Sequence, residues 1–279
     1  MTQPQNLTVA AIQLVSGRDL AANLVAAERL LAAAAAAGAQ LAVLPETFAL
    51  YDSRSQQALG AAEAGADAIV RPWLREQARR HGLWLVGGTV PLLEPGDMRP
   101  RAASLAVNDQ GEEVGRYDKL HLFDASVADG HGRYRESDVF QPGQKVTVVP
   151  TPWGGLGLAV CYDLRFPELF QQLRLNGATM IAVPSAFTRH TGQAHWLPLL
   201  RARAIETQCL MIGANQGGIH SERRQTSGGS AIVDAWGTVL AETGFGARPV
   251  IATFDQQRQL SIREAMPVLA HRRFGLTPP

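Results

Sequence analysis

The chain has 279 residues, of which 46% are hydrophobic and 18% charged, and its formal net charge at pH 7 is +1. This composition is typical of a globular protein with a well-filled core. The small net charge argues against a nucleic-acid or acidic-membrane binder, since either needs a concentrated basic surface, and no block of like charges supplies one.

The first residues of the chain and the cysteine count favour a cytoplasmic protein that binds no metal and spans no membrane. Residues 1–5 are polar, and the first apolar stretch, Leu7–Leu14, is too short and too regularly alternating for a secretory leader. The alanine-rich stretch Ala21–Ala37 is interrupted by polar residues and does not fit a membrane span. Cys161 and Cys209 make no disulfide framework, and no Cys/His cluster indicates structural zinc.

Hydrophobic periodicity and turn residues predict a layered α/β protein. The predicted strands are Leu7–Leu14, Leu41–Leu44, Leu83–Val90, Ala102–Val107, Glu113–Tyr117, Leu156–Val160, Thr179–Val183, Cys209–Ala214, Ser230–Val233, Thr238–Ala241 and Val250–Phe254. The predicted helices are Asp19–Ala37, one that ends with Trp73–His81, Phe166–Asn176 and Ala194–Thr207. No linker interrupts the pattern, so we expect one domain over residues 1–279, with helices covering a mixed sheet arrangement and a core from about 7 to 254. The tail Met266–Pro279 is expected to be irregular and to wrap the body or a partner subunit.

Cys161 is the first candidate for chemistry. It follows the apolar run Gly157–Val160, which predicts a buried strand, and the segment after it predicts a helix with Pro167 and Glu168 in its first turn. A thiol at such a strand-to-helix turn lies near unpaired backbone N–H groups, which favour the thiolate. Cys161 is therefore a candidate nucleophile. The alternative is a small buried apolar residue, as most free cysteines are.

Glu46 and Lys119 also follow predicted strands, and functional groups of α/β sheets gather at the carboxyl ends of strands. A glutamate there can take the proton of a thiol and return it to a leaving amine. A lysine can stabilise the anionic oxygen of a tetrahedral intermediate. Lysine occurs only at Lys119 and Lys145. Taken singly, Glu46 is equally compatible with a surface carboxylate, and Lys119 with a surface ion pair.

Three segments resemble the signatures of the nitrilase superfamily of carbon–nitrogen hydrolases, in the order of that family. They are Leu-Pro-Glu-Thr-Phe around Glu46, Asp-Lys-Leu-His-Leu-Phe-Asp around Lys119, and Cys-Tyr-Asp-Leu-Arg-Phe-Pro-Glu from Cys161. The resemblance extends from Leu7 to about Phe254. It implies a four-layer α-β-β-α sandwich, no metal or organic cofactor, and a homodimer or higher homo-oligomer.

The resemblance also implies a role for each catalytic candidate. Glu46 is the general base, Lys119 stabilises the oxyanion, and Cys161 carries the acyl group as a thioester. Glu136 matches the second glutamate of the family, which holds the lysine and helps to orient the substrate. The backbone N–H of Tyr162 completes the oxyanion hole with Lys119.

The segments from Pro184 and over Thr191–Cys209 resemble the amidases that hydrolyse deaminated glutathione, a substrate with a 2-oxoglutaramate-like end. This branch implies an amidase for a small carboxylate-bearing substrate. Arg165 is a candidate partner for that carboxylate, because a guanidinium fork matches a carboxylate in two hydrogen bonds. Phe187 and Thr188 are candidate pocket residues, or packing residues at the end of a strand.

Other interpretations stay open at this point. Within the same class, an N-carbamoyl amino acid amidohydrolase or an ω-amidase also fits. A Cys–His hydrolase that uses His121 or His195 is a further alternative, as is a catalytically idle homologue that binds or scaffolds. The presence of all four candidate catalytic residues weighs against the last.

The chain departs from the family pattern at three positions. Ser227 and Gly229 stand where a tyrosine and a histidine are usual, and Ala235 stands where a proline is usual before Trp-Gly. These changes leave the catalytic residues intact and leave the exact substrate open.

Overall fold

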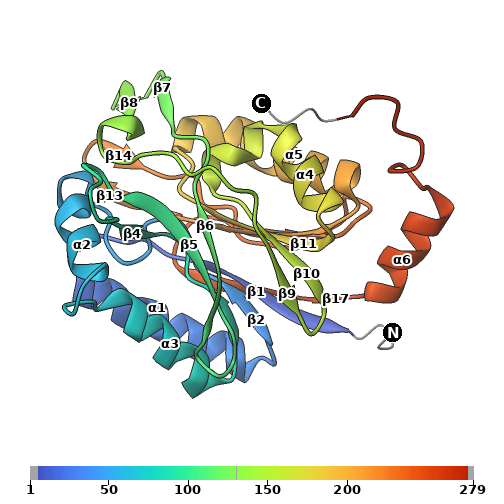
Figure 1. The fold of residues 1–279 in the computed structure, drawn as a ribbon, viewed down its shortest axis with the longest axis horizontal. Coiled ribbons are helices and arrows are strands. Elements are labelled where there is room, and N and C mark those ends of the chain that lie inside the picture. Colours follow the sequence, from blue (N-terminus) through green and yellow to red (C-terminus); the bar gives the residue numbers. More distant parts are fainter. Residues whose placement is uncertain (1–5, 130, 276–279) are drawn as a thin grey trace.

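The computed structural model describes residues 6–129 and 131–275. Over these residues, two large β-sheets pack face to face and helices cover their outer faces (Figure 1). The predicted four-layer α-β-β-α sandwich is therefore confirmed. No helix within this part of the chain is long and apolar enough to cross a membrane.

The two sheets divide the chain into an earlier and a later half, with the last strand returning to the first sheet. The first sheet has the order β17-β1-β2-β3-β5-β4, with β6 paired to β5, and the second has the order β16-β15-β12-β11-β10-β9. Their strands are β1 (Leu7–Gln13), β2 (Leu41–Val43), β3 (Trp84–Val86), β4 (Val90–Leu92), β5 (Arg101–Val107), β6 (Glu113–Asp118), β9 (Val148–Thr151), β10 (Gly154–Leu158), β11 (Ala178–Ser185), β12 (Leu210–Asn215), β15 (Ala231–Val233), β16 (Val239–Glu242) and β17 (Arg248–Phe254). Two small hairpins stand outside the sheets, formed by β7 (Asp124–Ser126) with β8 (Arg133–Arg135) and by β13 (Ile219–Ser221) with β14 (Arg224–Gln225).

The helices lie on the two outer faces and at one side of the sandwich. They are α1 (Leu20–Ala36), α2 (Gln56–Glu63), α3 (Val70–His81), α4 (Pro167–Leu175), α5 (Arg189–Thr207) and α6 (Gln256–Ala265). Figure 1 shows α1 and α3 below the sheets and α4 and α5 above them.

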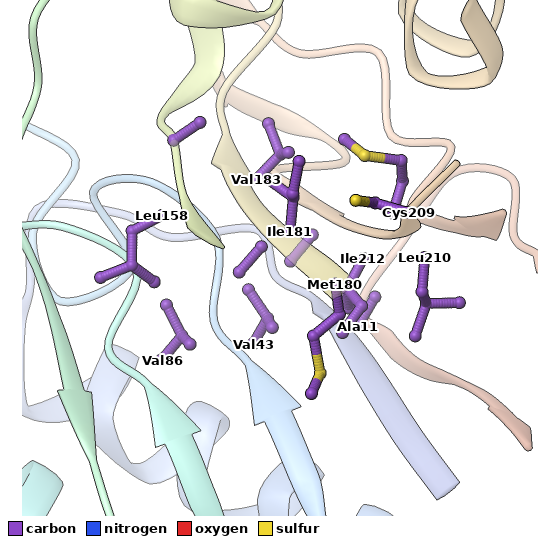
Figure 2. Close-up of a cluster of buried hydrophobic side chains, with 14 of the residues drawn as sticks. Ala11, Val43, Val86, Leu158, Met180, Ile181, Val183, Cys209, Leu210 and Ile212 are labelled. Carbon is purple, nitrogen blue, oxygen red and sulfur yellow. The ribbon is translucent and has the colours of Figure 1, made fainter. Parts of the chain in front are cut away.

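Alternation along β1 explains why its residues are apolar on both faces. Val9 and Ala11 point into the layer between the sheets, whereas Ala10 and Ile12 belong to the cluster under α1 and α3. Figure 2 shows this inner layer, in which Ala11 and Val43 come from the first sheet and Leu158 and Ile181 from the second. The inner layer fixes the two sheets against each other and so fixes the ends of their strands.

The predicted strand Leu83–Val90 is wrong, because the structure has two short strands, β3 and β4, in its place. Gly88 interrupts the run with a φ of 53°, in the left-handed region that favours glycine. A Cβ there would stand 2.1 Å from the carbonyl oxygen of Pro45. The break therefore lets the chain pass close to the loop that carries Glu46.

Three helices also differ from the prediction, and one of them, α2, was not predicted. Helix α5 begins at Arg189 rather than Ala194, since the Thr188 side chain caps it by accepting a hydrogen bond from the Thr191 N–H. Helix α6 was not predicted either, because its polar sequence buries only Gln259 and shows no apolar periodicity. The tail is irregular over 266–275, as expected, and 276–279 lie outside the described residues.

Candidate active site

The loop after β2 holds Glu46 in a fixed position. Thr47, the next residue, has a φ of 53° and donates its N–H to the Thr89 hydroxyl at 2.8 Å. The Glu46 carbonyl oxygen accepts a hydrogen bond from Gln216 Nε2 at 3.1 Å. The Glu46 residue is only 6% exposed, so its carboxylate is aimed into the protein.

The Lys119 ammonium lies between two carboxylates at the end of β6. Its Nζ donates to Glu46 Oε1 at 2.7 Å and to Glu136 Oε1 and Oε2 at 2.8 and 2.7 Å. Glu136 is itself held by the Phe123 N–H, which donates to Oε2 at 2.6 Å. Gly143 closes over this strand end, since its N–H donates to the Lys119 carbonyl at 2.8 Å. The structure thus brings Glu46, Lys119 and Glu136 together.

Burial and charge set the protonation of this cluster. Burial by itself lowers the pKa of Lys119, but Glu136 and Glu46 outweigh it and hold that pKa well above its usual value. Burial raises the pKa of Glu136, and the attraction of Lys119 opposes the rise. Lys119 therefore stays protonated, and its ammonium is hydrogen-bonded to two acidic groups, Glu46 and Glu136.

Cys161 stands three residues after the end of β10, at the first residue of a 3₁₀ turn, Cys161–Arg165, that precedes α4. Its φ of 50° is unusual for a residue with a side chain and marks a sharp turn. Pro167 occupies the first turn of α4, as the sequence predicts. The cysteine is 8% exposed and borders a small cavity.

The thiol environment differs from the expected thiolate-favouring turn. Burial and the negative charge of Glu46 raise the pKa of Cys161 well above its usual value, against the opposing effect of Lys119. A hydrogen bond from the Ala186 backbone acts in the same direction as Lys119. Cys161 is thus a thiol at rest, and a base must take its proton when it attacks. Glu46, which is hydrogen-bonded to the thiol, is in place to do so.

A second buried carboxylate, Asp163, ties the strand end of Lys119 to the turn of Cys161. Asp163 Oδ2 accepts from the Tyr117 hydroxyl at 2.7 Å and from the Val160 N–H at 2.8 Å. Asp163 Oδ1 accepts from the backbone N–H of His121 at 3.1 Å and contacts His121 Nδ1 at 2.7 Å. One carboxylate therefore joins residues on both sides of Lys119 to the residue that precedes Cys161.

The cavity beside the nucleophile is small. Its lining includes the predicted pocket residues, and consists of Phe123, Cys161, Tyr162, Arg165, Ala186, Phe187, Thr188 and Thr191. The Arg165 guanidinium lies over two aromatic rings, 5.8 Å from the Tyr162 centroid and 5.5 Å from the Phe187 centroid. Thr188 has a structural task as well, since it caps α5.

Neither histidine of the Cys–His alternative is placed as a base for Cys161. His121 is bonded to Asp163 and stacks on Phe166, with ring centroids 3.7 Å apart. His195 contacts Arg165 through Nδ1 at 3.3 Å. Within residues 6–129 and 131–275, no group of His, Cys, Asp and Glu side chains is arranged to hold a metal ion.

Two of the family departures lie in a loop that touches the pocket wall. The Ser227 N–H donates to the carbonyl of Phe187 at 3.0 Å, and Gly229 accepts the indole hydrogen bond of Trp196 at 2.6 Å. Gly229 has a φ of 76°, which suits a glycine better than the usual histidine. Ala235 is buried in the turn between β15 and β16.

Sequence reasoning missed three residues at the mouth of the site: Tyr51, Tyr134 and Arg224. Arg224 lies over both rings, with its guanidinium carbon 4.9 Å from the Tyr134 centroid and 5.9 Å from the Tyr51 centroid. No local pattern marks these residues, because they come from a loop and from two small hairpins that are far apart in the sequence.

Comparisons with known proteins agree with this geometry. A family model described as carbon-nitrogen hydrolase matches residues 8–264. This chain belongs to the carbon–nitrogen hydrolase family. Its resemblance to the nitrilase superfamily is thereby confirmed, and the protein is a hydrolase of carbon–nitrogen bonds.

Several relatives carry an amidase name. The deaminated glutathione amidase of Yersinia enterocolitica is 43% identical over 272 residues, which cover 97% of this chain and 94% of that protein. The human deaminated glutathione amidase is 39% identical, with 95% of this chain and 82% of that protein covered.

Solved structures show the same fold. A Saccharomyces cerevisiae member of branch 10 of the nitrilase superfamily matches with a TM-score of 0.87 at 31% identity, and 97% of each chain is covered. The Caenorhabditis elegans NitFhit protein matches with a TM-score of 0.90 at 37% identity over 98% of this chain, which spans 66% of that longer one. In the amidase from Nesterenkonia sp. AN1, 26% identical with a TM-score of 0.79 and coverage of 96% of this chain and 98% of that one, the active-site cysteine carries the acetamide moiety of fluoroacetamide.

Replacement of Asp163 by asparagine tests its positioning role. Asp163→Asn turns one acceptor into an NH₂ group that faces N–H and O–H donors, so the free energy of unfolding should fall by about 3 kcal/mol. The value of kcat should fall more than KM rises, because the Lys119 and Cys161 segments lose their common tie. Urea unfolding and steady-state kinetics measure both effects. Asp109→Asn, an exposed change in the β5–β6 turn, is the control. A stability loss with an unchanged kcat would reduce Asp163 to a purely structural residue.

Proposed function

We propose that this protein is an amidase that hydrolyses the ω-amide bond of a small carboxylate-bearing substrate, with deaminated glutathione as the best candidate. The observation that carries the proposal is the Lys119 ammonium, held between Glu46 and Glu136 beside the Cys161 thiol. The names of the relatives support the substrate class.

In the first half of the reaction, Glu46 accepts the thiol proton and the Cys161 sulfur forms a bond to the amide carbon. Lys119 and the backbone N–H of Tyr162 stabilise the oxygen that becomes anionic. The tetrahedral intermediate then expels the amine, which takes the proton from Glu46. The product of this half is a thioester on Cys161 and a free amine.

In the second half, a water molecule attacks the thioester and gives its proton to Glu46. Collapse of this intermediate releases the carboxylic acid and returns the proton to the sulfur. The overall reaction converts the amide and one water molecule into a carboxylic acid and an amine, and it needs no oxidant or reductant.

The charges of the cluster explain how Lys119 can serve the oxyanion although it already faces two carboxylates. At rest, two acidic groups surround one ammonium. When Glu46 takes the proton of Cys161 it becomes neutral and its hold on the ammonium weakens. Lys119 then has an N–H and a positive charge to offer at the moment when the carbonyl oxygen becomes negative.

Arg165 is our candidate for the carboxylate at the acyl end of the substrate. It lines the same cavity as Cys161, and two aromatic rings hold its guanidinium. Phe187 and Thr188 complete this wall. An N-carbamoyl amino acid or a simple ω-amide also carries a carboxylate, so these substrates are the alternatives to be compared.

We also propose that the enzyme is cytoplasmic and that it forms a homodimer or a higher homo-oligomer. Exposed apolar side chains that include Trp236 and Ile205 support an interface. Light scattering on the purified protein measures the oligomer.

A substrate panel tests the function directly. Deaminated glutathione, 2-oxoglutaramate and an N-carbamoyl amino acid are incubated with the enzyme, and the acid and amine or ammonia are quantified. We expect the highest kcat/KM with deaminated glutathione, and no turnover by the Cys161→Ala variant. A preference for the carbamoyl compound would replace our substrate assignment, and turnover without Cys161 would remove the thioester mechanism.

The variant Lys119→Arg tests the oxyanion role. Arginine keeps the charge but changes the donor geometry in a site where lysine is almost fully buried. We expect kcat to fall on the order of 10²–10³, as for the loss of an oxyanion donor. Lys145→Arg, an exposed change, is the matched control. If Lys119→Arg keeps more than roughly a tenth of the wild-type kcat, the assignment fails.

The variant Arg165→Ala tests the acyl-end carboxylate contact. Loss of a charged hydrogen bond should lower kcat/KM for 2-oxoglutaramate by about tenfold to a hundredfold. Hydrolysis of a neutral short amide such as butyramide should change little. Equal losses on both substrates would mean that Arg165 supports the fold of the turn rather than the substrate.

A further inference from the structure

Arg224 is a second guanidinium at the site without an acidic partner. It lies over the rings of Tyr51 and Tyr134, and it also bonds to the Tyr134 hydroxyl. Among the described residues, no carboxylate comes within ion-pair distance of it. The half-buried Arg71, by contrast, is paired with Glu113 at 2.8 Å.

The surroundings of Arg224 match those of Arg165. Each guanidinium rests on two aromatic rings and each lacks a carboxylate within ion-pair distance among the described residues. An arginine held in this way keeps its charge and an oriented planar donor fork that no carboxylate occupies, which suits recognition of a carboxylate. The pair therefore offers two anion sites rather than one.

Arg224 is close to the reacting groups. Burial raises the pKa of Tyr51, Arg224 acts against that rise, and the charges of Glu46 and Cys161 add to it. The Tyr134 ring packs on Phe123, with centroids 5.1 Å apart, and Phe123 lines the cavity of Cys161. Arg224 is thus linked to the catalytic cavity through the packed rings of Tyr134 and Phe123.

A larger hollow of about 280 Å³ lies next to that cavity, on the other side of the first turn of α5. Thr188 and Thr191 line the catalytic cavity, whereas Arg189 and His190 line the larger hollow. The remaining lining of the larger hollow is Ala128, Asp129, Gln193, Glu222, Arg223 and Gln225. The two residues that flank Arg224 in the sequence, Arg223 and Gln225, are therefore part of the wall of the larger hollow.

The acid nearest to this stack in the fold is already engaged. Asp129 accepts hydrogen bonds from the N–H groups of His131 and Gly132, at 3.0 and 2.9 Å, and from the Tyr134 hydroxyl at 2.8 Å. Its negative charge is therefore used to hold the β7–β8 hairpin, and Arg224 is left for a ligand.

We propose that Arg224 binds a carboxylate on the amine leaving group of the substrate, opposite the acyl-end carboxylate that faces Arg165. This inference rests on the proposed function. An amide whose amine is a dipeptide needs room beyond the scissile bond and ends in a carboxylate, and the larger hollow and Arg224 supply both. The leaving group then departs as a free amine through the open hollow.

The test compares deaminated glutathione, its C-terminal carboxamide, and 2-oxoglutaramate, whose leaving group is ammonia. In the wild-type enzyme, the carboxamide should have a KM about tenfold or more above that of the acid, as expected for a lost charged hydrogen bond. In Arg224→Ala this ratio should fall to about one, while KM for the carboxamide and for 2-oxoglutaramate stays within about twofold of wild type. Arg224→Lys should recover part of the ratio, since it restores charge without the fork.

Arg133→Ala is the matched control, because it removes an exposed arginine from β8 beside Tyr134. It should leave the ratio unchanged. A wild-type enzyme that does not distinguish acid from carboxamide overturns the proposal. An Arg224→Ala variant whose kcat/KM falls equally for all three substrates also overturns it, since this would mean that Arg224 only supports the two tyrosines.

A second readout separates this inference from the proposed function. Chloroacetyl-alanylglycine and its C-terminal amide alkylate a cysteine without any turnover, and peptide mass mapping measures the rate at Cys161. We expect the acid to react faster than the amide in the wild type and not in Arg224→Ala. If no substrate of the panel is hydrolysed, the proposed function fails and this measurement still decides on Arg224. No preference for the acid would overturn the Arg224 site.

Discussion

The Lys119 ammonium is shut away from water between two carboxylates, and the rest of the active site depends on what that burial costs. A buried cation loses its hydration, which only close oppositely charged groups can offset. Glu46 and Glu136 supply them within 2.8 Å. Breaking such a pair from one side leaves an unpaired buried charge at a cost of about 3–5 kcal/mol. The three side chains are thus bound to one another energetically before any substrate arrives.

Such a cluster needs a rigid frame, because charge pairs lose their value when distances grow. Glu46 and Glu136 come from the first half of the chain with Lys119, but Cys161 follows a strand of the second sheet. The apolar layer between the sheets sets that distance, and Asp163 fixes it locally by bonding to Tyr117 on one side and to Val160 on the other. A hydrophobic layer and one buried carboxylate together place the thiol against its base.

The sequence was most informative where function and local pattern coincide. Glu46, Lys119 and Cys161 could be predicted because each follows a strand and stands in a recognisable segment. The layered fold followed from the period of the hydrophobic residues. Helix α6 could not be predicted in this way, since polar hydrogen bonds rather than an apolar face hold it: Gln259 alone bonds the carbonyls of Thr179 and Gln208. The raised pKa of Cys161 was also out of reach, because it arises from burial in the folded protein and from the charge of Glu46, 115 residues earlier in the chain.

Tyr51 and Arg224 were missed for the same reason, and they show how chemistry and recognition are divided in this site. The chain has only two lysines, and one of them is the buried cation of the catalytic cluster. The cations at the cavity wall are arginines on aromatic faces, whose charge cannot be removed by titration and whose planar forks suit carboxylates. Salt and water screen the charges that lie nearer to solvent, so these charges exchange partners easily. The charges of a buried cluster are screened much less and keep their partners. Substitutions in the loop behind the cavity wall, as at Ser227 and Gly229, can change which amide is accepted, while the buried Glu46–Lys119–Glu136 cluster keeps the same reaction.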